Sequence, residues 1–289
     1  MQHNLLYYVT GSLSFSYIVL TIALLGIPLT ITALFKICIP VKSFRKVCDH
    51  IMAGIYRTTV RMDDFLYIHL LGIKIEVYGD YSLTRDGQYL IISNHRNWAD
   101  AFMVQHAVVY QGPIAKFLAK ANLIYVPLIG MICWAFDFPM LKRNAKKQGI
   151  TDAVRLQQDL ETIRAASHNM VKGPFALVNF AEGTRYTKAK HAQQNSPYFN
   201  LLKPKSGGLY VLLQALTEHL SSVIDITVTY DKKDATFFKV LAGGIKHIRV
   251  YVELFEPASL NFESREELNV WLEQCWQKKA RRVKESIRE

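Results

Sequence analysis

A histidine and an aspartate, His95 and Asp100, stand five positions apart and form the first candidate for chemistry in this sequence. They lie in the stretch LIISNHRNWADAFM, residues 90–103, where His95 follows an apolar run that predicts a buried strand. The residues after it predict a helix that begins close to Asp100. Because a strand-to-helix turn exposes its side chains at a sheet edge, Asp100 can accept a hydrogen bond from one ring nitrogen of His95. The other ring nitrogen is then free to take a proton from a substrate hydroxyl.

The same spacing also has a structural interpretation, and the sequence leaves both open. Asn97 has the chemistry of a helix N-cap, and Asp100 three residues later would satisfy backbone N–H groups in the first helical turn. No serine or cysteine stands in a recognisable nucleophile turn nearby. If the pair is catalytic, direct attack by the substrate's own hydroxyl therefore suits it better than a covalent acyl-enzyme.

A second polar cluster follows another predicted strand, in LVNFAEGTRYT at residues 177–187. Gly183 allows close approach of a backbone, Thr184 offers a hydroxyl, and Arg185 can bind a phosphate through two parallel hydrogen bonds. The alternative is a surface turn with an ion pair between Glu182 and Arg185.

Alternating strand-like and helix-like segments surround these clusters, and they predict an α/β fold with a mixed central sheet flanked by helices. We expect strands at residues 74–78, 89–93, 113–118, 137–141, 175–180, 223–230 and 248–255. We expect helices at residues 99–109, 127–134, 151–166, 207–220 and 264–287.

The N-terminal part predicts attachment to a membrane. Residues 13–35 contain no charged side chain and are numerous enough to cross a bilayer, although Gly26 and Pro28 leave open a bent segment in one leaflet. A cleaved signal peptide is not expected, because no basic segment precedes the run. Basic residues follow the run and predict that the bulk of the protein lies on the cytoplasmic side, the inner membrane in a bacterium: Lys36, Lys42, Arg45 and Lys46.

Residues 51–71 have apolar side chains at helical spacing and predict an amphipathic helix. This helix would lie on the membrane surface or pack on the catalytic domain, and the sequence does not choose between them. We therefore expect an N-terminal anchor with this helix over residues 1–72 and a catalytic domain over residues 73–289.

Charge and cysteine spacing limit the partners. The net charge of +11 favours anionic partners, but no RNP-like, KH-like or zinc-finger pattern supports nucleic acid. The four cysteines have no zinc-site spacing, so no metal is expected and reduced thiols are the preferred interpretation. The basic residues of the last predicted helix form a solvated face or contact anionic lipid: Lys278, Lys279, Arg281, Arg282, Lys284 and Arg288.

The two polar clusters in this order resemble the glycerolipid acyltransferase family, which includes the lysophosphatidic acid acyltransferases. Between them, AKANLIYVPLIGMICWAFDFPMLKRN is similar to the second conserved block of that family, and LLKPKSGGLYVLLQAL followed by VIDITVTY occupies the place of the fourth. Matching positions of the second block are Lys120, Pro127, Gly130, Phe138 and Arg143. Ala181 stands where the family's third block usually has proline, and VIDITVTY lacks the usual proline of the fourth. The pattern looks closest to the branch of YihG-like bacterial and lysocardiolipin-type enzymes.

The resemblance implies a membrane-bound acyltransferase with the fold of that family. His95 would be the general base, oriented by Asp100, that activates the free glycerol hydroxyl of a lysophospholipid. The acceptor would be 1-acyl-sn-glycerol-3-phosphate or a larger lysophospholipid, and the donor acyl-CoA or acyl-carrier protein, consumed as a co-substrate without a cofactor. Residues implied to hold the acceptor are Arg143, Glu182, Gly183, Thr184 and Arg185.

Two other functions remain open on the sequence. A CoA-independent phospholipid transacylase would use the same His–Asp pair without a thioester. A non-catalytic basic scaffold at the membrane would need neither His95 nor Asp100, yet both are present together with Glu182 and Arg185.

Overall fold

The computed structural model describes residues 5–141, 152–168, 170–260 and 262–287. A six-stranded sheet with the order β1-β8-β7-β2-β6-β3 forms its centre. The strands are β1 (Lys74–Tyr78), β2 (Gln88–Ser93), β3 (Ala115–Phe117), β6 (Phe175–Phe180), β7 (Ser222–Tyr230) and β8 (His247–Phe255).

The strand directions make the sheet mixed. β2 pairs in parallel with both β6 and β7, β3 pairs in parallel with β6, and β8 is antiparallel to β7. Since β2, β6 and β7 run in the same direction, their carboxyl ends lie at one edge of the sheet. The two polar clusters of the sequence follow β2 and β6, so the topology brings them to this common edge.

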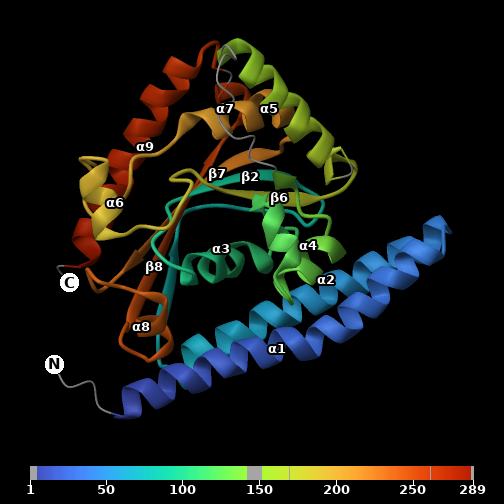
Figure 1. The fold of residues 1–289 in the computed structure, drawn as a ribbon, viewed down its shortest axis with the longest axis horizontal. Helices are drawn as coiled ribbons and strands as arrows, with labels where there is room; N and C mark the ends of the chain where they lie inside the picture. Colours follow the sequence, from blue (N-terminus) through green and yellow to red (C-terminus); the bar gives the residue numbers. More distant parts are fainter. Residues whose placement is uncertain (1–4, 142–151, 169, 261, 288–289) are drawn as a thin grey trace.

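Helices cover both faces of the sheet (Figure 1). One face carries α3 (Ala99–Val109) and the N-terminal helices, and the other carries α5 (Asp152–Ser167), α7 (Ser206–Leu216) and α9 (Arg265–Ser286). Side chains of β2 alternate between the two cores: Tyr89 and Ile91 belong to the first, and Leu90 and Ile92 to the second. This burial on both faces explains the continuous apolar run of the sequence. The mixed α/β fold flanked by helices is therefore confirmed.

Smaller elements lie at the sheet edges. Strands β4 (Ala119–Lys120) and β5 (Met140–Leu141) form a separate two-stranded sheet, so the expected strand at 137–141 is much shorter than predicted. Three short helices are α4 (Ile129–Ala135), α6 (Lys188–Gln193) and α8 (Phe237–Leu241). Single turns of 3-10 helix are η2 (Ala121–Tyr125), η3 (Met170–Lys172), η4 (Thr217–His219) and η5 (Pro257–Leu260).

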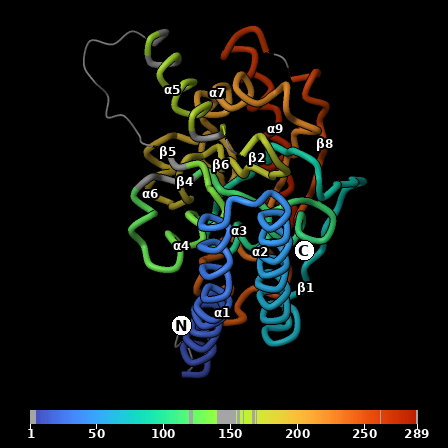
Figure 2. The backbone as a smooth tube through the Cα atoms, turned by 90° about the vertical axis from the view of Figure 1, so that its right-hand side faces the viewer, coloured from blue at the N-terminus to red at the C-terminus, as the bar shows by residue number. Residues whose placement is uncertain are grey.

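The N-terminal segment forms a hairpin of two long helices, α1 (Leu5–Cys38) and α2 (Lys42–Asp64), which lie side by side (Figure 2). α1 is helical through Gly26 and Pro28, so the interruption considered for the sequence does not break it. Among the described residues, α1 is the one helix long and apolar enough to cross a membrane, with a mean hydropathy of 2.4 over its best window.

α2 packs on the catalytic core, which decides between the two interpretations of the amphipathic helix. Met52, Tyr56 and Val60 belong to the same core cluster as α3. The helix starts at Lys42 and continues after Asp64 as a π-helical turn, η1 (Phe65–Leu70), whereas we expected it over 51–71. The shared core thus runs across the expected domain boundary at residue 72.

The basic run of α9 is only partly a solvated face. Lys279 is fully buried and contacts Oδ1 of Asp225 on β7 at 2.7 Å. Lys278 and Arg282 both contact Glu253 on β8. The expectation of a solvated or lipid-facing run is wrong for Lys279, because α9 packs on the sheet and a buried carboxylate there needs a cation.

Candidate active site

His95 and Asp100 meet at the turn between β2 and α3. Nδ1 of His95 lies 3.0 Å from Oδ2 of Asp100, and the Asp100 side chain is fully buried while that of His95 is 14% exposed. The carboxylate accepts, so Nδ1 carries the hydrogen and Nε2 is the free acceptor of the neutral ring. No partner of Nε2 lies within the part of the chain that the structure describes. The pair therefore has the geometry of an oriented general base.

The structural interpretation of Asp100 is also correct, because the oxygen that contacts the His95 ring also binds backbone N–H groups of the turn. Oδ2 accepts hydrogen bonds from the backbone N–H of Arg96 at 2.5 Å and of Asn97 at 2.8 Å. In return, Oδ1 of Asn97 accepts from the N–H of Ala99 at 2.7 Å. These bonds satisfy backbone N–H groups ahead of and at the start of α3, and they hold in place the oxygen that the His95 ring contacts.

Tyr230 is a member of the site that the sequence did not reveal. Its hydroxyl, at the carboxyl end of β7, donates to Oδ1 of Asp100 at 2.6 Å. Burial beside this carboxylate raises the pKa of Tyr230 far above its usual value, so the hydroxyl stays protonated and is the hydrogen-bond donor. With this bond, Asp100 accepts four hydrogen bonds.

Aromatic rings form the wall behind the His95 ring. Phe180, the last residue of β6, stacks on His95 with the ring centroids 3.9 Å apart and the planes 13° apart. Phe117 of β3 stacks on Phe180 in turn, at 5.9 Å. Hydrogen bonding fixes one direction of the imidazole and stacking fixes its plane, so its Nε2 has one preferred orientation.

Glu182 is fully buried and binds backbone rather than solvent. Oε1 accepts from the N–H of His95 and Oε2 from the N–H of Leu202, both at 3.3 Å. Burial raises its pKa to about 8, against the opposing effect of these two hydrogen bonds. The surface ion pair with Arg185 that we considered is therefore wrong, and the carboxyl group instead joins the turn after β6 to His95.

Backbone conformation shapes the turn after β6. Gly183 has φ of +68°, a left-handed value that glycine adopts without a Cβ clash, and its N–H donates to the carbonyl of Phe180 at 2.8 Å. Ala181 donates its N–H to the carbonyl of Ser93 in β2 at 3.3 Å. A proline at this position would lack that donor.

Thr184 and Arg185 lie on the outer side of the turn. The Thr184 hydroxyl accepts from Nζ of Lys190 at 2.7 Å. The exposed guanidinium of Arg185 lies 4.6 Å from the ring centroid of Trp98, a cation–π contact that brings it over the start of α3. Arg143 lies outside the described residues.

Arg96 is a second residue that sequence reasoning missed. Its side chain is buried between the rings of Tyr186 and Tyr230, and Nη2 donates to the carbonyl of Lys233 at 2.7 Å. Burial lowers its pKa, opposed by the charge of Asp100. The local sequence around His95 does not show that Arg96 is buried in the site. Its partners, Tyr186, Tyr230 and Lys233, lie about 90 to 140 positions away in the sequence.

Comparison with known proteins agrees with this arrangement. The sequence model of the family named Acyltransferase matches residues 74–231, more than half of the chain. The probable 1-acyl-sn-glycerol-3-phosphate acyltransferase 5 of Arabidopsis thaliana is 26% identical over 74% of this chain. Lysocardiolipin acyltransferase 1 of Gallus gallus is 24% identical over 83% of it. The chain spans 57% and 64% of the length of these relatives, respectively.

A solved structure has a similar fold. The crystal structure of the 1-acyl-sn-glycerophosphate acyltransferase PlsC from Thermotoga maritima aligns with a TM-score of 0.60 over 96% of this chain and 98% of that chain, at 14% identity. The family match covers β1 through β7 and with them His95, Asp100 and the turn after β6. The chain belongs to the Acyltransferase family.

Proposed function

We propose that this protein is a membrane-bound acyltransferase that transfers a fatty-acyl group from a thioester to the free glycerol hydroxyl of a lysophospholipid. The observation that carries the proposal is the His95–Asp100 pair, in which Nδ1 of His95 is hydrogen-bonded to the Asp100 carboxylate and Nε2 has no partner among the described residues. The names of the relatives support an acceptor of the 1-acyl-sn-glycerol-3-phosphate or lysocardiolipin class.

The reaction follows from the tautomer of His95, which has its hydrogen on Nδ1 and leaves Nε2 as the proton acceptor. Nε2 of His95 takes the proton of the acceptor hydroxyl while the oxygen attacks the thioester carbonyl. Asp100 stabilises the imidazolium that forms. When the tetrahedral intermediate collapses, the C–S bond breaks, the ester is complete, and the proton held by His95 passes to the leaving thiolate. Neither a covalent acyl-enzyme nor a redox step is needed.

The acceptor phosphate is assigned to the outer side of the turn after β6. Arg185 is exposed there and presents a planar guanidinium, which suits a phosphate bound through two hydrogen bonds. Gly183 and Thr184 shape the adjoining backbone, and Arg143 keeps the assisting role that the family resemblance implies. Glu182 acts as a positioning residue, because its two oxygens bind the backbone of His95 and Leu202.

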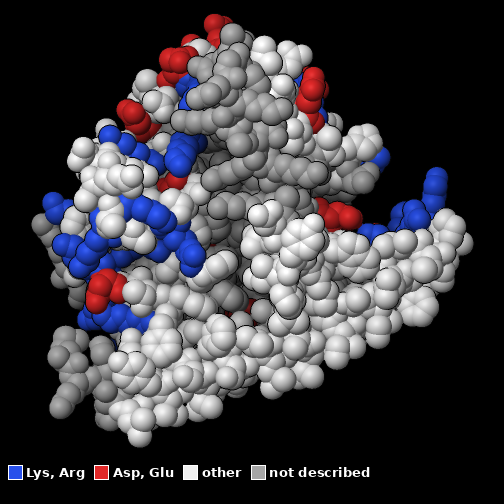
Figure 3. All heavy atoms as spheres, in the orientation of Figure 1, with Lys and Arg blue, Asp and Glu red and all other residues white. Residues whose placement is uncertain are grey.

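Membrane contact is assigned to the outer face of α1. Its exposed side chains include Leu13, Leu20, Leu24 and Ile27, each more than half exposed. In Figure 3 this face is free of charged residues along most of its length, and Lys and Arg gather at the end where α1 turns into α2. These basic residues support a position of the catalytic domain on the cytoplasmic side.

The packing of α1 supports attachment to one leaflet rather than a crossing. A Cβ on Gly11 would lie 2.6 Å from the ring of Phe238 in α8, so α1 and α8 are in close contact here and a larger residue would require this ring to shift. Gly26, further along, lies against Met131 of α4. A helix held against the domain at two distant points follows the domain surface instead of leaving it.

The test is an assay of the purified protein in detergent micelles with oleoyl-CoA and a panel of lysophospholipids, beside His95→Ala. We expect CoA release that requires an acceptor and disappears in the variant. Release that persists in His95→Ala would contradict the proposal. Acyl exchange between phospholipids with CoA withheld would instead support the transacylase.

A further inference from the structure

The segment between β4 and β5 exposes large apolar side chains. Residues 121–136, with the sequence ANLIYVPLIGMICWAF, form η2 and α4 and contain no charged residue. Tyr125 is 85% exposed, and four more apolar side chains are between 36% and 39% exposed: Ile124, Val126, Ile129 and Trp134. We call these five residues the η2–α4 patch. Exposed apolar side chains gathered in this way mark a surface that contacts a membrane or another molecule.

Backbone conformation holds the patch in its exposed form. Leu128, between η2 and α4, has φ of +63°, a left-handed value that is unfavourable for a residue with a branched side chain. The N–H of Ile129 donates across it to the carbonyl of Pro127 at 2.7 Å, which closes a γ-turn of the rarer, strained kind. Strain of this kind is concentrated at functional positions of proteins. The exposed turn is therefore a second indication of a contact surface here.

The patch continues the exposed apolar face of α1. α4 lies beside α1 in both Figure 1 and Figure 2, and a Cβ on Gly26 of α1 would lie 2.4 Å from Cε of Met131 in α4. Leu20, Leu24 and Ile27 of α1 are more than half exposed. Figure 3 shows an uncharged surface that runs from α4 to α1. The two elements thus present one apolar surface, and a leaflet that covers α1 also reaches the patch.

The side chains of the patch suit lipid. Tyr125 and Trp134 have an apolar ring with one polar atom, the combination found where acyl chains meet headgroups. The other three residues are aliphatic and match the acyl chains themselves. α1, which the patch continues, is long and apolar enough to cross a membrane. This continuity favours a phospholipid leaflet over a protein partner.

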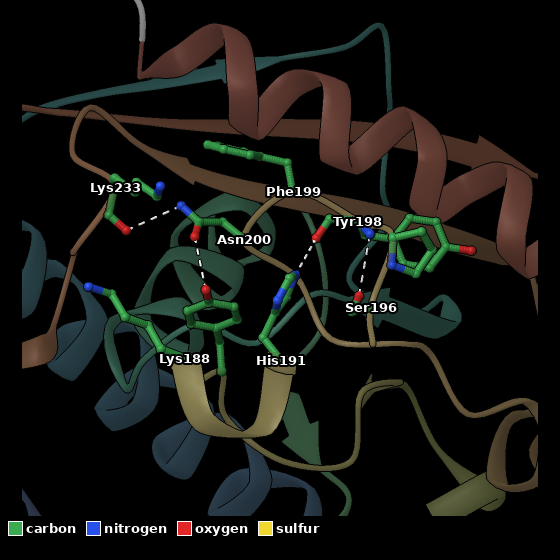
Figure 4. A pocket seen from close by; sticks show the side chains of 9 residues that line it. Lys188, His191, Ser196, Tyr198, Phe199, Asn200 and Lys233 are labelled. Carbon is green, nitrogen blue, oxygen red and sulfur yellow. Dashed lines mark hydrogen bonds between the residues drawn. The ribbon is translucent and has the colours of Figure 1, made fainter. Parts of the chain in front are cut away.

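The other side of the candidate site has a different character. Figure 1 shows α6 and α4 on opposite sides of α3. Beside α6, Lys188 and Lys233 supply ammonium groups to a pocket of about 550 Å³, where Figure 4 shows the Tyr186 hydroxyl donating to Oδ1 of Asn200 at 3.0 Å. Cationic groups suit the level of the phosphate headgroups. The uncharged side at α4 is the one that suits the acyl chains of the same leaflet.

A series of aromatic rings connects the patch to His95. The ring centroid of Phe138, which follows α4, lies 6.3 Å from that of Phe117 in β3. Phe117 stacks on Phe180, and Phe180 stacks on His95. α4 and the imidazole therefore belong to one packed unit, so contact of the patch with lipid would fix the position of His95 relative to the membrane.

We propose that the η2–α4 patch inserts into the same phospholipid leaflet as α1 and forms a second membrane contact, supplied by the catalytic domain itself. The inference rests on the membrane attachment in the proposed function, and it extends this attachment beyond the N-terminal hairpin. With two contacts in one leaflet, the catalytic domain cannot swing about the hairpin. His95 then keeps one orientation toward an acceptor that stays in the membrane.

The first measurement uses the fluorescence of Trp134 in the unmutated protein. The protein is bound to vesicles of phosphatidylcholine and phosphatidylglycerol whose acyl chains carry bromine, which quenches a tryptophan ring in contact with it. We expect quenching of the emission, and Trp134→Phe should reduce the quenched share at least twofold. Trp271→Phe is the matched control, because Trp271 packs on Phe255 and Phe262 beside α9. This control should leave the quenched share unchanged.

The second measurement is vesicle flotation of the variant that combines Tyr125→Gln with Ile129→Gln and leaves α1 intact. We expect it to bind vesicles at least fivefold more weakly, with an unchanged far-UV circular dichroism spectrum. Leu254→Gln is the control, because Leu254 on β8 is 36% exposed, as Ile129 is. The control should bind as the unmutated protein does.

Both measurements can overturn the proposal, and neither depends on catalysis. Emission that is not quenched, or is quenched equally in Trp134→Phe, overturns it, as does full binding by the double variant. If the unmutated protein sediments as a dimer in micelles and the double variant as a monomer, the occupant of the patch is a second copy of the chain. Quenching of Trp134 without any acyl transfer would contradict the proposed function and leave the membrane contact standing. Acyl transfer without quenching would do the reverse.

Discussion

The hydroxyl of Tyr230 donates to the carboxylate of Asp100 at 2.6 Å, across 130 positions of sequence. The Tyr230 hydroxyl binds Oδ1 of Asp100, whereas His95 and two backbone N–H groups bind Oδ2. The Asp100 carboxylate is therefore held from both sides, by its own turn and by the neighbouring strand β7. This arrangement makes Tyr230 a positioning residue for the pair.

Replacing Tyr230 with Phe should lower kcat about tenfold, because an unpaired buried carboxylate oxygen costs about 1–3 kcal/mol and loosens the orientation of Asp100. The acceptor KM should stay within twofold, since Tyr230 is not assigned to substrate binding. Steady-state kinetics with oleoyl-CoA measure both. Tyr210→Phe is the control, as its hydroxyl makes one exposed hydrogen bond, to the carbonyl of Glu263. An equal loss in the control would refute a specific role.

Replacing Asp100 with Asn separates its two roles. The two backbone N–H groups that bind Oδ2 require an oxygen there, so we expect the amide oxygen to take that position and keep the Nδ1–H tautomer of His95. What is lost is the negative charge that stabilises the imidazolium. We therefore expect kcat to fall about a hundredfold, less than the ~10⁴ that a reversed tautomer costs in a serine protease. A loss below threefold would mean that Asp100 only caps α3.

The bounds of several elements were predicted to within one residue. β1, β6 and α3 have the predicted bounds, and β2, β7 and β8 begin one residue earlier than expected. β2 and β6 have neighbours on both sides and helices on both faces, so most of their positions are apolar. Short helices were missed because five or six residues show no helical period: α6 and α8 depend on Thr187 and Thr236 as N-caps.

The candidate site was predicted only as far as local sequence extends. His95 and Asp100 share one turn, so their spacing carried the signal. The contacts of Tyr230 and Arg96 depend on the strand order, which places β7 next to β2. A single sequence does not show which strands will be neighbours. The burial of Glu182 was missed for the same reason, because Leu202 and the His95 N–H that it binds come from separate segments.

Glu182 should make stability depend on pH. Its pKa is about 8 in the folded protein, above the usual value near 4.5, so the folded state holds a proton that the unfolded state releases. Stability from this group is present below about pH 4.5 and is lost as the pH rises to about 8, by about 1.4 kcal/mol per unit. Glu182→Gln removes this titration. The free energy of unfolding of the variant, relative to that of the unmutated protein, should therefore increase from pH 5 to pH 8.

Denaturant unfolding in micelles at pH 5, 6.5 and 8 measures this difference. Glu218→Gln is the control, because it removes an exposed carboxylate of η4 and so reports the general effect of charge. A constant difference between Glu182→Gln and the unmutated protein at all three pH values would show that the carboxyl group does not titrate in this range.

Substituting Gln for both Leu20 and Leu24 should weaken membrane binding. These side chains of α1 are 58% and 57% exposed. Moving the exposed part of each into lipid is therefore favourable by about half of the roughly 1.5–3 kcal/mol that full burial of a leucine gives. We expect the double variant to bind phospholipid vesicles at least tenfold more weakly in a flotation assay, while its kcat in micelles stays near that of the unmutated protein. Val270→Gln provides the control, since Val270 is equally exposed, at 58%, on α9. If the control loses as much binding as the double variant, or the double variant loses none, α1 is not the membrane-contacting surface.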